Sequence, residues 1–162
     1  MAANDYVFVD HFTAPCDPQT AYHYISRIEE YPRWWGTVYK KITKLNEVPE
    51  GQPGARYAVT VSGFLPYKLA LQNEVVHLDR PNRIEFNATG DLEGKGVWTF
   101  EKTEAGTKLT FDWRVLANKK VIRWFSFLLK PLFRANHVYC VRKAKEGMTK
   151  DLMGKQPFST SL

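Results

Sequence analysis

Hydrophobic and polar positions divide the chain into a long stretch of alternating character and two stretches of helical spacing. Alternation predicts strands at 6–15, 39–48, 56–63, 68–78, 82–89, 97–102 and 108–116. The later strands follow one another through short connections, which antiparallel neighbours tolerate and parallel ones do not. The segment 90–96 contains three glycines and is predicted as a tight turn or bulge.

The first helical stretch has a clear start signal. Asp17 can cap the helix and Pro18 suits the first helical position. An apolar face follows at spacings of three and four residues, at Ala21, Tyr24, Ile25 and Ile28. Tyr31-Pro32 is predicted to end this helix, because the residue before a proline disfavours the α conformation. Residues 33–36 are then predicted to form a second short helix or turn.

The last long stretch, 119–153, predicts one helix bent at Pro131. Its apolar stripe consists of Phe133, His137, Cys140, Ala144, Gly147 and Met148. The opposite face is basic, with Arg134, Arg142, Lys143, Lys145 and Lys150. A long helix with one apolar stripe needs a surface to cover, and the predicted sheet supplies it. We therefore expect one α+β domain over 1–153 and a flexible tail over 154–162.

The composition fits a single domain with a sizeable interior. A chain of 162 residues buries about 70% of its unfolded surface on folding. Aromatic residues make up 14% of the chain. Such a share indicates either a well-filled core or a cavity lined by rings for an apolar or planar ligand. The composition leaves both interpretations open.

The positive charge is concentrated at the C-terminal end. The net charge is +6, and residues 119–155 carry ten Lys/Arg against two Asp/Glu. A solvated face is the ordinary interpretation, and contact with an anionic membrane surface through 119–134 is the next. No motif for nucleic acid accompanies the charge, so no such partner is expected. The apolar run 121–133 is too short and too charged to span a bilayer.

The sequence contains few residue patterns that are typical of metal, phosphate or cofactor binding. Cys16 and Cys140 lie far apart and form no metal-ligand pattern, and no phosphate or dinucleotide loop is present. We therefore expect no metal and no cofactor. The polar N-terminus does not resemble a signal peptide, and with the two cysteines it indicates a reduced, cytoplasmic protein.

Several segments, in this order, carry a resemblance to a known family. They are 31–35 (YPRWW), 89–94 (TGDLEG) with Trp98, 112–115 (DWRV), 130–133 (KPLF), 136–137 (NH) and 146–148 (EGM). The chain resembles the START-like (SRPBCC) helix-grip superfamily, and within it the polyketide cyclase/dehydrase and lipid-transport family. The resemblance implies a curved antiparallel sheet of about seven strands around the C-terminal helix. It also implies two short helices between strands one and two, and an apolar cavity between sheet and helix.

His137 is the candidate for chemistry. Its place in the apolar stripe turns it towards the sheet, where an imidazole can act as a general base or bind a ligand carbonyl. The alternative is a core histidine bonded to a backbone carbonyl or to Asn136. The other candidate ligand-binding residues are Trp35, Tyr57, Phe86, Trp98, Trp113, Phe133 and Cys140. For the tryptophans, simple core packing is the competing interpretation.

Two functions fit these expectations. The first is binding, or transport, of a hydrophobic small molecule such as a lipid, quinone or polyketide. The second is a polyketide cyclase- or dehydratase-like enzyme that uses the same cavity, with His137 removing a proton next to a carbonyl. No set of residues for a known catalytic mechanism stands out, so the sequence leaves open whether the protein is an enzyme.

Overall fold

The computed structural model describes residues 5–118 and 120–155, and the side chains of 5–118 and 130–152. In chain order the elements are β1 (Asp5–Ala14), α1 (Pro18–Ser26), a 3-10 helix (Ile28–Glu30), α2 (Tyr31–Trp34), β2 (Tyr39–Lys44), β3 (Arg56–Val61), β4 (Leu69–Asp79), β5 (Arg83–Gly90), β6 (Leu92–Thr103), β7 (Gly106–Ala117) and α3 (Lys120–Lys155).

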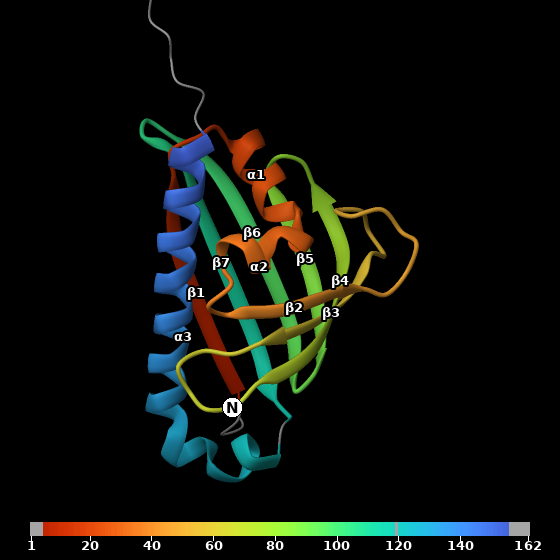
Figure 1. Ribbon diagram of the computed structural model, residues 1–162, viewed down its shortest axis with the longest axis vertical. Helices are drawn as coiled ribbons and strands as arrows, with labels where there is room; N and C mark the ends of the chain where they lie inside the picture. The colour runs from red at the N-terminus through yellow and green to blue at the C-terminus, as the bar shows by residue number, and fades with distance from the viewer. Residues whose placement is uncertain (1–4, 119, 156–162) are drawn as a thin grey trace, which may run out of the picture.

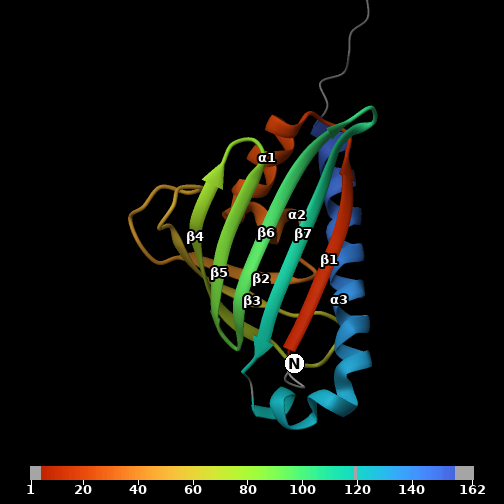
Figure 2. The same ribbon diagram turned by 180° about the vertical axis from the view of Figure 1, so that it is seen from behind.

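The seven strands form one antiparallel sheet in the order β1-β7-β6-β5-β4-β3-β2. Figures 1 and 2 show that the sheet curves and that all helices lie on its concave side. The strand β1 closes one edge because the chain leaves it through α1 and α2 and returns at the opposite edge with β2. The predicted α+β helix-grip fold is confirmed.

The core lies between the sheet and the C-terminal part of α3. On β6 and β7 the inward positions alternate as predicted, and Trp98 opposes Phe111 while Phe100 opposes Leu109. All four side chains are at least nine-tenths buried. Ala144 and Met148 of α3 belong to the same buried cluster. The apolar stripe of the helix therefore covers the sheet as its spacing indicates.

The region between β1 and β2 differs from the prediction in one respect. The helix α1 begins as expected, with the Asp17 carboxylate accepting a hydrogen bond of 2.7 Å from the Thr20 backbone N–H. It ends at Ser26, however, and Tyr31-Pro32 begins α2 instead of ending α1. The prediction for this dipeptide was wrong because a proline in the first turn of a helix needs no N–H partner. Tyr31, the residue before the proline, is the first residue of α2, and the 3-10 turn Ile28–Glu30 separates it from α1.

The glycine-rich segment 90–96 is also more regular than predicted. The strand β6 begins at Leu92, and both Gly94 and Gly96 are paired within the sheet. A Cβ atom at Gly96 would collide with the ring of Phe86 on the neighbouring strand. The glycine is therefore a site of close approach, where a side chain packs across the backbone of the adjacent strand.

The helix α3 contains Pro131 and continues to Lys155, two residues past the predicted end. Its axis changes direction between the first turns, drawn in cyan, and the long part drawn in blue (Figure 1). A proline inside a helix removes one backbone hydrogen bond and accounts for such a change. Residues 156–162 of the predicted tail lie outside the described part of the chain. No described helix has the length and apolarity that crossing a membrane requires.

Candidate functional site

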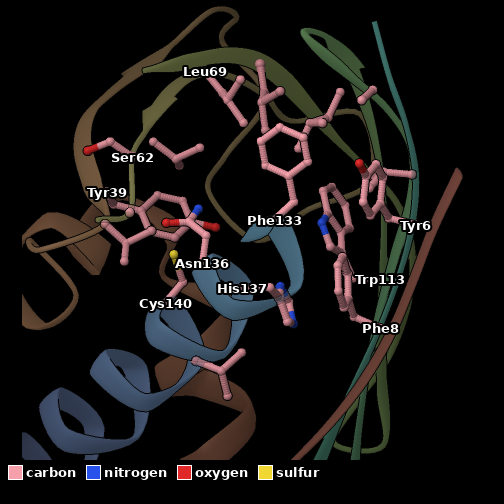
Figure 3. Close-up of a pocket in the computed structure, with 18 of the residues that line it drawn as sticks. Tyr6, Phe8, Tyr39, Ser62, Leu69, Trp113, Phe133, Asn136, His137 and Cys140 are labelled. Carbon is pink, nitrogen blue, oxygen red and sulfur yellow. The ribbon is translucent and has the colours of Figure 1, made fainter. Parts of the chain in front are cut away.

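A cavity of about 160 Å³ lies between the concave face of the sheet and the middle of α3. We call it the main cavity. Figure 3 shows side chains from β1, β7, the segment after β3, and α3 converging on it. Among the described side chains that line it, none is Lys, Arg, Asp or Glu. The lining is therefore apolar and aromatic, which suits an uncharged guest.

Three near-parallel rings form one wall of the main cavity, and we call them the aromatic floor. They are Phe86 of β5 with Phe111 and Trp113 of β7. Their ring centroids lie 5.6–6.2 Å apart, and their planes differ by 13–29°. Gly96 lies between Phe86 and Trp113 in the sheet register, so no side chain of β6 separates the two rings. A flat platform of this kind favours contact with a planar apolar ligand.

His137 lines the main cavity and is paired with Asp10 of β1. The distance from Nε2 of His137 to Oδ2 of Asp10 is 2.6 Å, and the side chains are only 15% and 19% exposed. The imidazole also stacks on Phe8, with 3.8 Å between the ring centroids. The Asp10 hydrogen bond and the Phe8 contact fix the position of the ring and leave Nδ1 as the nitrogen that remains for a ligand.

The expected alternative partners of His137 were wrong. Within the described part of the chain, its hydrogen-bond partner is Asp10, and neither a backbone carbonyl nor Asn136. The signal for Asp10 is present in the sequence, because it has the same alternation parity as Phe8 and Phe12. An acidic residue on the apolar face of a strand requires a partner, and His137 on the inward face of α3 provides one.

Asn136 instead fastens the segment after β3 to α3 at the edge of the main cavity. Its Oδ1 accepts hydrogen bonds from the backbone N–H groups of Phe64 at 2.9 Å and Leu65 at 3.3 Å. A Cβ atom at Gly63 would collide with this amide, so the close approach requires glycine. The ring of Phe64 also meets Tyr139 edge-on, at 5.6 Å. The segment is thus held against the helix beside the cavity.

The paired tryptophans after α1 have different roles. Trp35 lines the main cavity, and its indole N–H donates a hydrogen bond of 2.9 Å to the Cys140 carbonyl of α3. Trp34 does not line the main cavity; it packs against Tyr24, with 5.0 Å between ring centroids. A Cβ atom at Gly147 of α3 would collide with the Trp34 carbonyl. Trp34 therefore anchors α2 to α3 while Trp35 presents a ring to the site.

A second, smaller cavity of about 40 Å³ lies further in, beneath α1 and α2, and we call it the inner cavity. Of the candidate ligand-binding residues, Tyr57 and Trp98 line the inner cavity and not the main one. The other candidates all line the main cavity, and they are Trp35, Phe86, Trp113, Phe133, His137 and Cys140. Two of these, Trp35 and Phe86, border both spaces.

Burial favours the neutral forms of Cys140, Tyr57 and Tyr67, which line the two cavities. Burial raises the pKa of the Cys140 thiol to about 11 and that of the Tyr57 hydroxyl to about 12. Burial, with smaller contributions from Tyr6 and Cys140, also raises the pKa of Tyr67. Among the described residues, no group of three His, Cys, Asp or Glu side chains is placed to hold a metal ion. The site can therefore enclose an apolar molecule and offer it a few neutral hydrogen-bonding groups.

Comparison with protein families gives a match that extends over most of the chain. The model described as "Polyketide cyclase / dehydrase and lipid transport" matches residues 7–148. No curated protein matches the chain at a significant level.

Solved structures with the same fold cover the chain at low identity. The crystal structure of TTHA0849 from Thermus thermophilus is 15% identical, with a TM-score of 0.71 over 94% of this chain and 99% of that one. The di-domain ARO/CYC protein StfQ, from the steffimycin biosynthetic pathway, is 16% identical. Its TM-score is 0.63, over 94% of this chain and 53% of that one. The di-domain ARO/CYC protein BexL, from the BE-7585A pathway, is 14% identical, with a TM-score of 0.64 over 90% of this chain and 50% of that one. The chain thus spans about half of each di-domain protein.

Proposed function

Because the chain belongs to the polyketide cyclase/dehydrase and lipid-transport family, we propose that it binds, and carries, an uncharged hydrophobic small molecule in the main cavity. The observation that supports this most is a cavity of about 160 Å³ with an aromatic floor and no charged side chain among its described lining. A cavity of about 150 Å³ accommodates benzene. One or two fused rings of a lipid, quinone or polyketide would therefore be enclosed, with any remainder at the mouth.

The test is to fill the main cavity and measure the loss of binding. 2-Methylnaphthalene is an uncharged two-ring probe, and its binding is followed by its own fluorescence. Cys140→Phe places a ring in the cavity and should weaken binding at least about tenfold, the equivalent of about 1.4 kcal/mol. Val138→Phe is the matched control, because Val138 lies two residues away on α3 and is 65% exposed. The proposal fails if wild type does not bind the probe, or if both variants weaken binding equally.

A second candidate function is cyclisation or dehydration of a polyketide-like substrate. The observation that favours it is the Asp10–His137 pair, which places an oriented imidazole in an otherwise apolar cavity. In an aldol cyclisation His137 would remove the proton next to a carbonyl, and a tyrosine or tryptophan donor would bind the enolate oxygen. Incubation of wild type and His137→Ala with poly-β-ketone mimics tests this. Product formation that depends on His137 supports it, and equal rates with either protein contradict it.

We also propose transient contact with anionic membranes through residues 119–134. Leu132 is 42% exposed beside the basic residues Lys130 and Arg134. The side chains of the apolar residues at 124–128 of the same stretch lie outside the described part of the chain. Flotation with phosphatidylserine-containing and purely zwitterionic liposomes tests it, and absence of binding to the anionic ones at low salt removes it.

We further propose a cytoplasmic location. Both described cysteines, Cys16 and Cys140, are free thiols, as expected in a reducing compartment. Fractionation of the native host tests this directly, and recovery from the medium or periplasm would contradict it.

A further inference from the structure

Asn73 lies near the middle of β4, between Tyr57 of β3 and Ala88 of β5. It is only 5% exposed and lines both the main and the inner cavity. Its amide oxygen Oδ1 has no hydrogen-bond partner among the described residues. The buried Tyr22 and Tyr57 hydroxyls and the Trp34 indole N–H also have no hydrogen-bond partner there, but none of these side chains lines both cavities. The buried Thr107 hydroxyl donates to the Cys16 carbonyl at 2.7 Å.

A buried amide without a partner lowers the stability of a protein, and an apolar residue of similar size would avoid that cost. Native proteins keep such groups mainly where a partner from outside the chain satisfies them. The position is also specific: five side chains border both cavities, and four of them are aromatic. The five are Trp35, Tyr39, Asn73, Phe86 and Phe111. Asn73 is thus the one non-aromatic side chain among the described residues that border both cavities.

This inference rests on the proposed function. We propose that Asn73 hydrogen-bonds a hydroxyl group of the ligand at the partition between the two cavities, while the rings of the ligand lie on the aromatic floor. The residue then determines specificity: it selects oxygenated, uncharged ring compounds over plain hydrocarbons. The aromatic floor supplies binding energy to both classes, and only the amide distinguishes them.

The groups around Asn73 favour a neutral hydroxyl of the ligand over a charged group. A terminal amide offers an acceptor on one side and two donors on the other, and a hydroxyl group both donates and accepts. A carboxylate would lose its hydration without gaining a cation, since no described lining residue is Lys or Arg and His137 already faces Asp10. The inner cavity, at about 40 Å³, admits a group the size of a hydroxyl but no second ring.

The experiment compares 2-naphthol with 2-methylnaphthalene, which differ by a hydroxyl in place of a methyl group, and adds 2-naphthoate as the charged analogue. Wild type should bind 2-naphthol about tenfold more tightly than 2-methylnaphthalene, or about 1.4 kcal/mol, and should bind 2-naphthoate most weakly. Asn73→Leu should abolish the preference for 2-naphthol and leave 2-methylnaphthalene binding unchanged or tighter. The melting temperature of the ligand-free variant should stay equal or rise.

The matched control is Asn87→Leu, which changes an exposed asparagine on β5 and should leave the preference intact. If wild type binds none of the probes, the proposed function itself fails. If wild type binds them but Asn73→Leu weakens 2-naphthol and 2-methylnaphthalene equally, the role of Asn73 is overturned while the proposed function stands. Tighter binding of 2-naphthoate overturns the preference for neutral ligands. Should Asn73→Leu not fold, Asn73→Ala supplies the same comparison.

Discussion

The helix α3 covers the sheet in two different ways along its length. From Ala144 to Leu152 its inward side chains are almost fully buried against the sheet, and we call this the packed half. From Phe133 to Cys140 its inward side chains are half-buried and line the main cavity, and we call this the open half. Both halves face aromatic rings of the sheet: the open half faces Phe111 and Trp113 of β7, and the packed half belongs to a cluster that includes Trp98 and Phe100 of β6.

The polar side chains at the main cavity, and not the rings, distinguish the two halves. In the open half, Asp10, Asn73 and Asn136 accompany His137 at or beside the cavity. In the packed half, Asp151 pairs with Arg33 at 2.6 Å, away from the main cavity. Aromatic residues fill a core as readily as they line a site. Inward-facing polar groups are the better sign of a ligand, because burying them without a partner is costly.

The largest expected difference between the packed half and the open half concerns two tryptophans on adjacent strands. Trp98 is 3% exposed and belongs to the packed core, whereas Trp113 borders the main cavity. Trp98→Ala should lower the free energy of unfolding by about 3–5 kcal/mol, because it leaves a void among fixed neighbours. Trp113→Ala should cost less than about 2 kcal/mol, because its ring already borders open space.

Urea denaturation measures both costs, and 2-methylnaphthalene binding is measured on each variant that folds. Trp113→Ala should lose at least about tenfold in affinity, since it removes a ring of the aromatic floor. Equal losses of stability in the two variants would mean that the open half is packed as tightly as the packed half, and the distinction would be wrong.

The second test concerns the reactivity of Cys140 in the open half. Burial raises its pKa to about 11, so at pH 8 the thiolate fraction is roughly 200-fold below that of a free cysteine with a pKa of about 8.5. Alkylation by iodoacetamide should therefore be about 200-fold slower than for a model thiol with a pKa of about 8.5. Because the pH lies below the raised pKa, the rate should increase about tenfold for each unit between pH 7 and 9.

Mass spectrometry of the Cys16→Ser variant follows Cys140 alone. Adding 2-methylnaphthalene should slow the reaction further at every pH, because a guest in the main cavity covers the thiol. A rate that levels off below pH 9 would show that the thiol titrates as a solvated group. The main cavity in the open half would then contain more water than its apolar lining indicates.

Most of the fold could be predicted from the sequence because strands and helices have different hydrophobic periodicities. The alternation on β6 and β7 placed Trp98, Phe100 and Leu109 inward, and the Asp17-Pro18 signal located the start of α1. The prediction failed at Tyr31-Pro32, and at 90–96 it found the tight turn between β5 and β6 but missed the pairing of Gly94 and Gly96 within β6. In both segments the local signals of proline and glycine have two meanings. Packing across strands, as between Phe86 and Gly96, decides between these meanings, and no local pattern contains it.

The site was predictable only in part. Periodicity tells which face of a strand or helix a residue occupies, but not how far along the cavity it lies. Tyr57 and Trp98 are inward, as predicted, yet they border the inner cavity and not the main one. The Asp10–His137 pair joins positions 127 residues apart, and the lack of a partner for Asn73 depends on several elements at once. Such contacts arise from the assembled fold.

The smallest expected effect concerns the Asp10–His137 pair, which has a matched counterpart on the surface of the same sheet. The guanidinium of Arg114 lies 2.9 Å from Asp112, with side-chain exposures of 66% and 31%. Asp10→Asn should lower the free energy of unfolding by about 1 kcal/mol, because a largely buried, charge-assisted hydrogen bond becomes a neutral one. Asp112→Asn should cost less than about 0.5 kcal/mol, since water solvates both partners.

A double-mutant cycle of Asp10→Asn with His137→Phe measures the coupling energy between the two side chains. The single variant His137→Phe should change 2-naphthol binding more than it changes the free energy of unfolding. Equal costs for the two aspartates, or no coupling in the cycle, would show that the pair in the open half behaves like an ordinary surface pair. The imidazole would then be too loosely held for either ligand recognition or proton transfer.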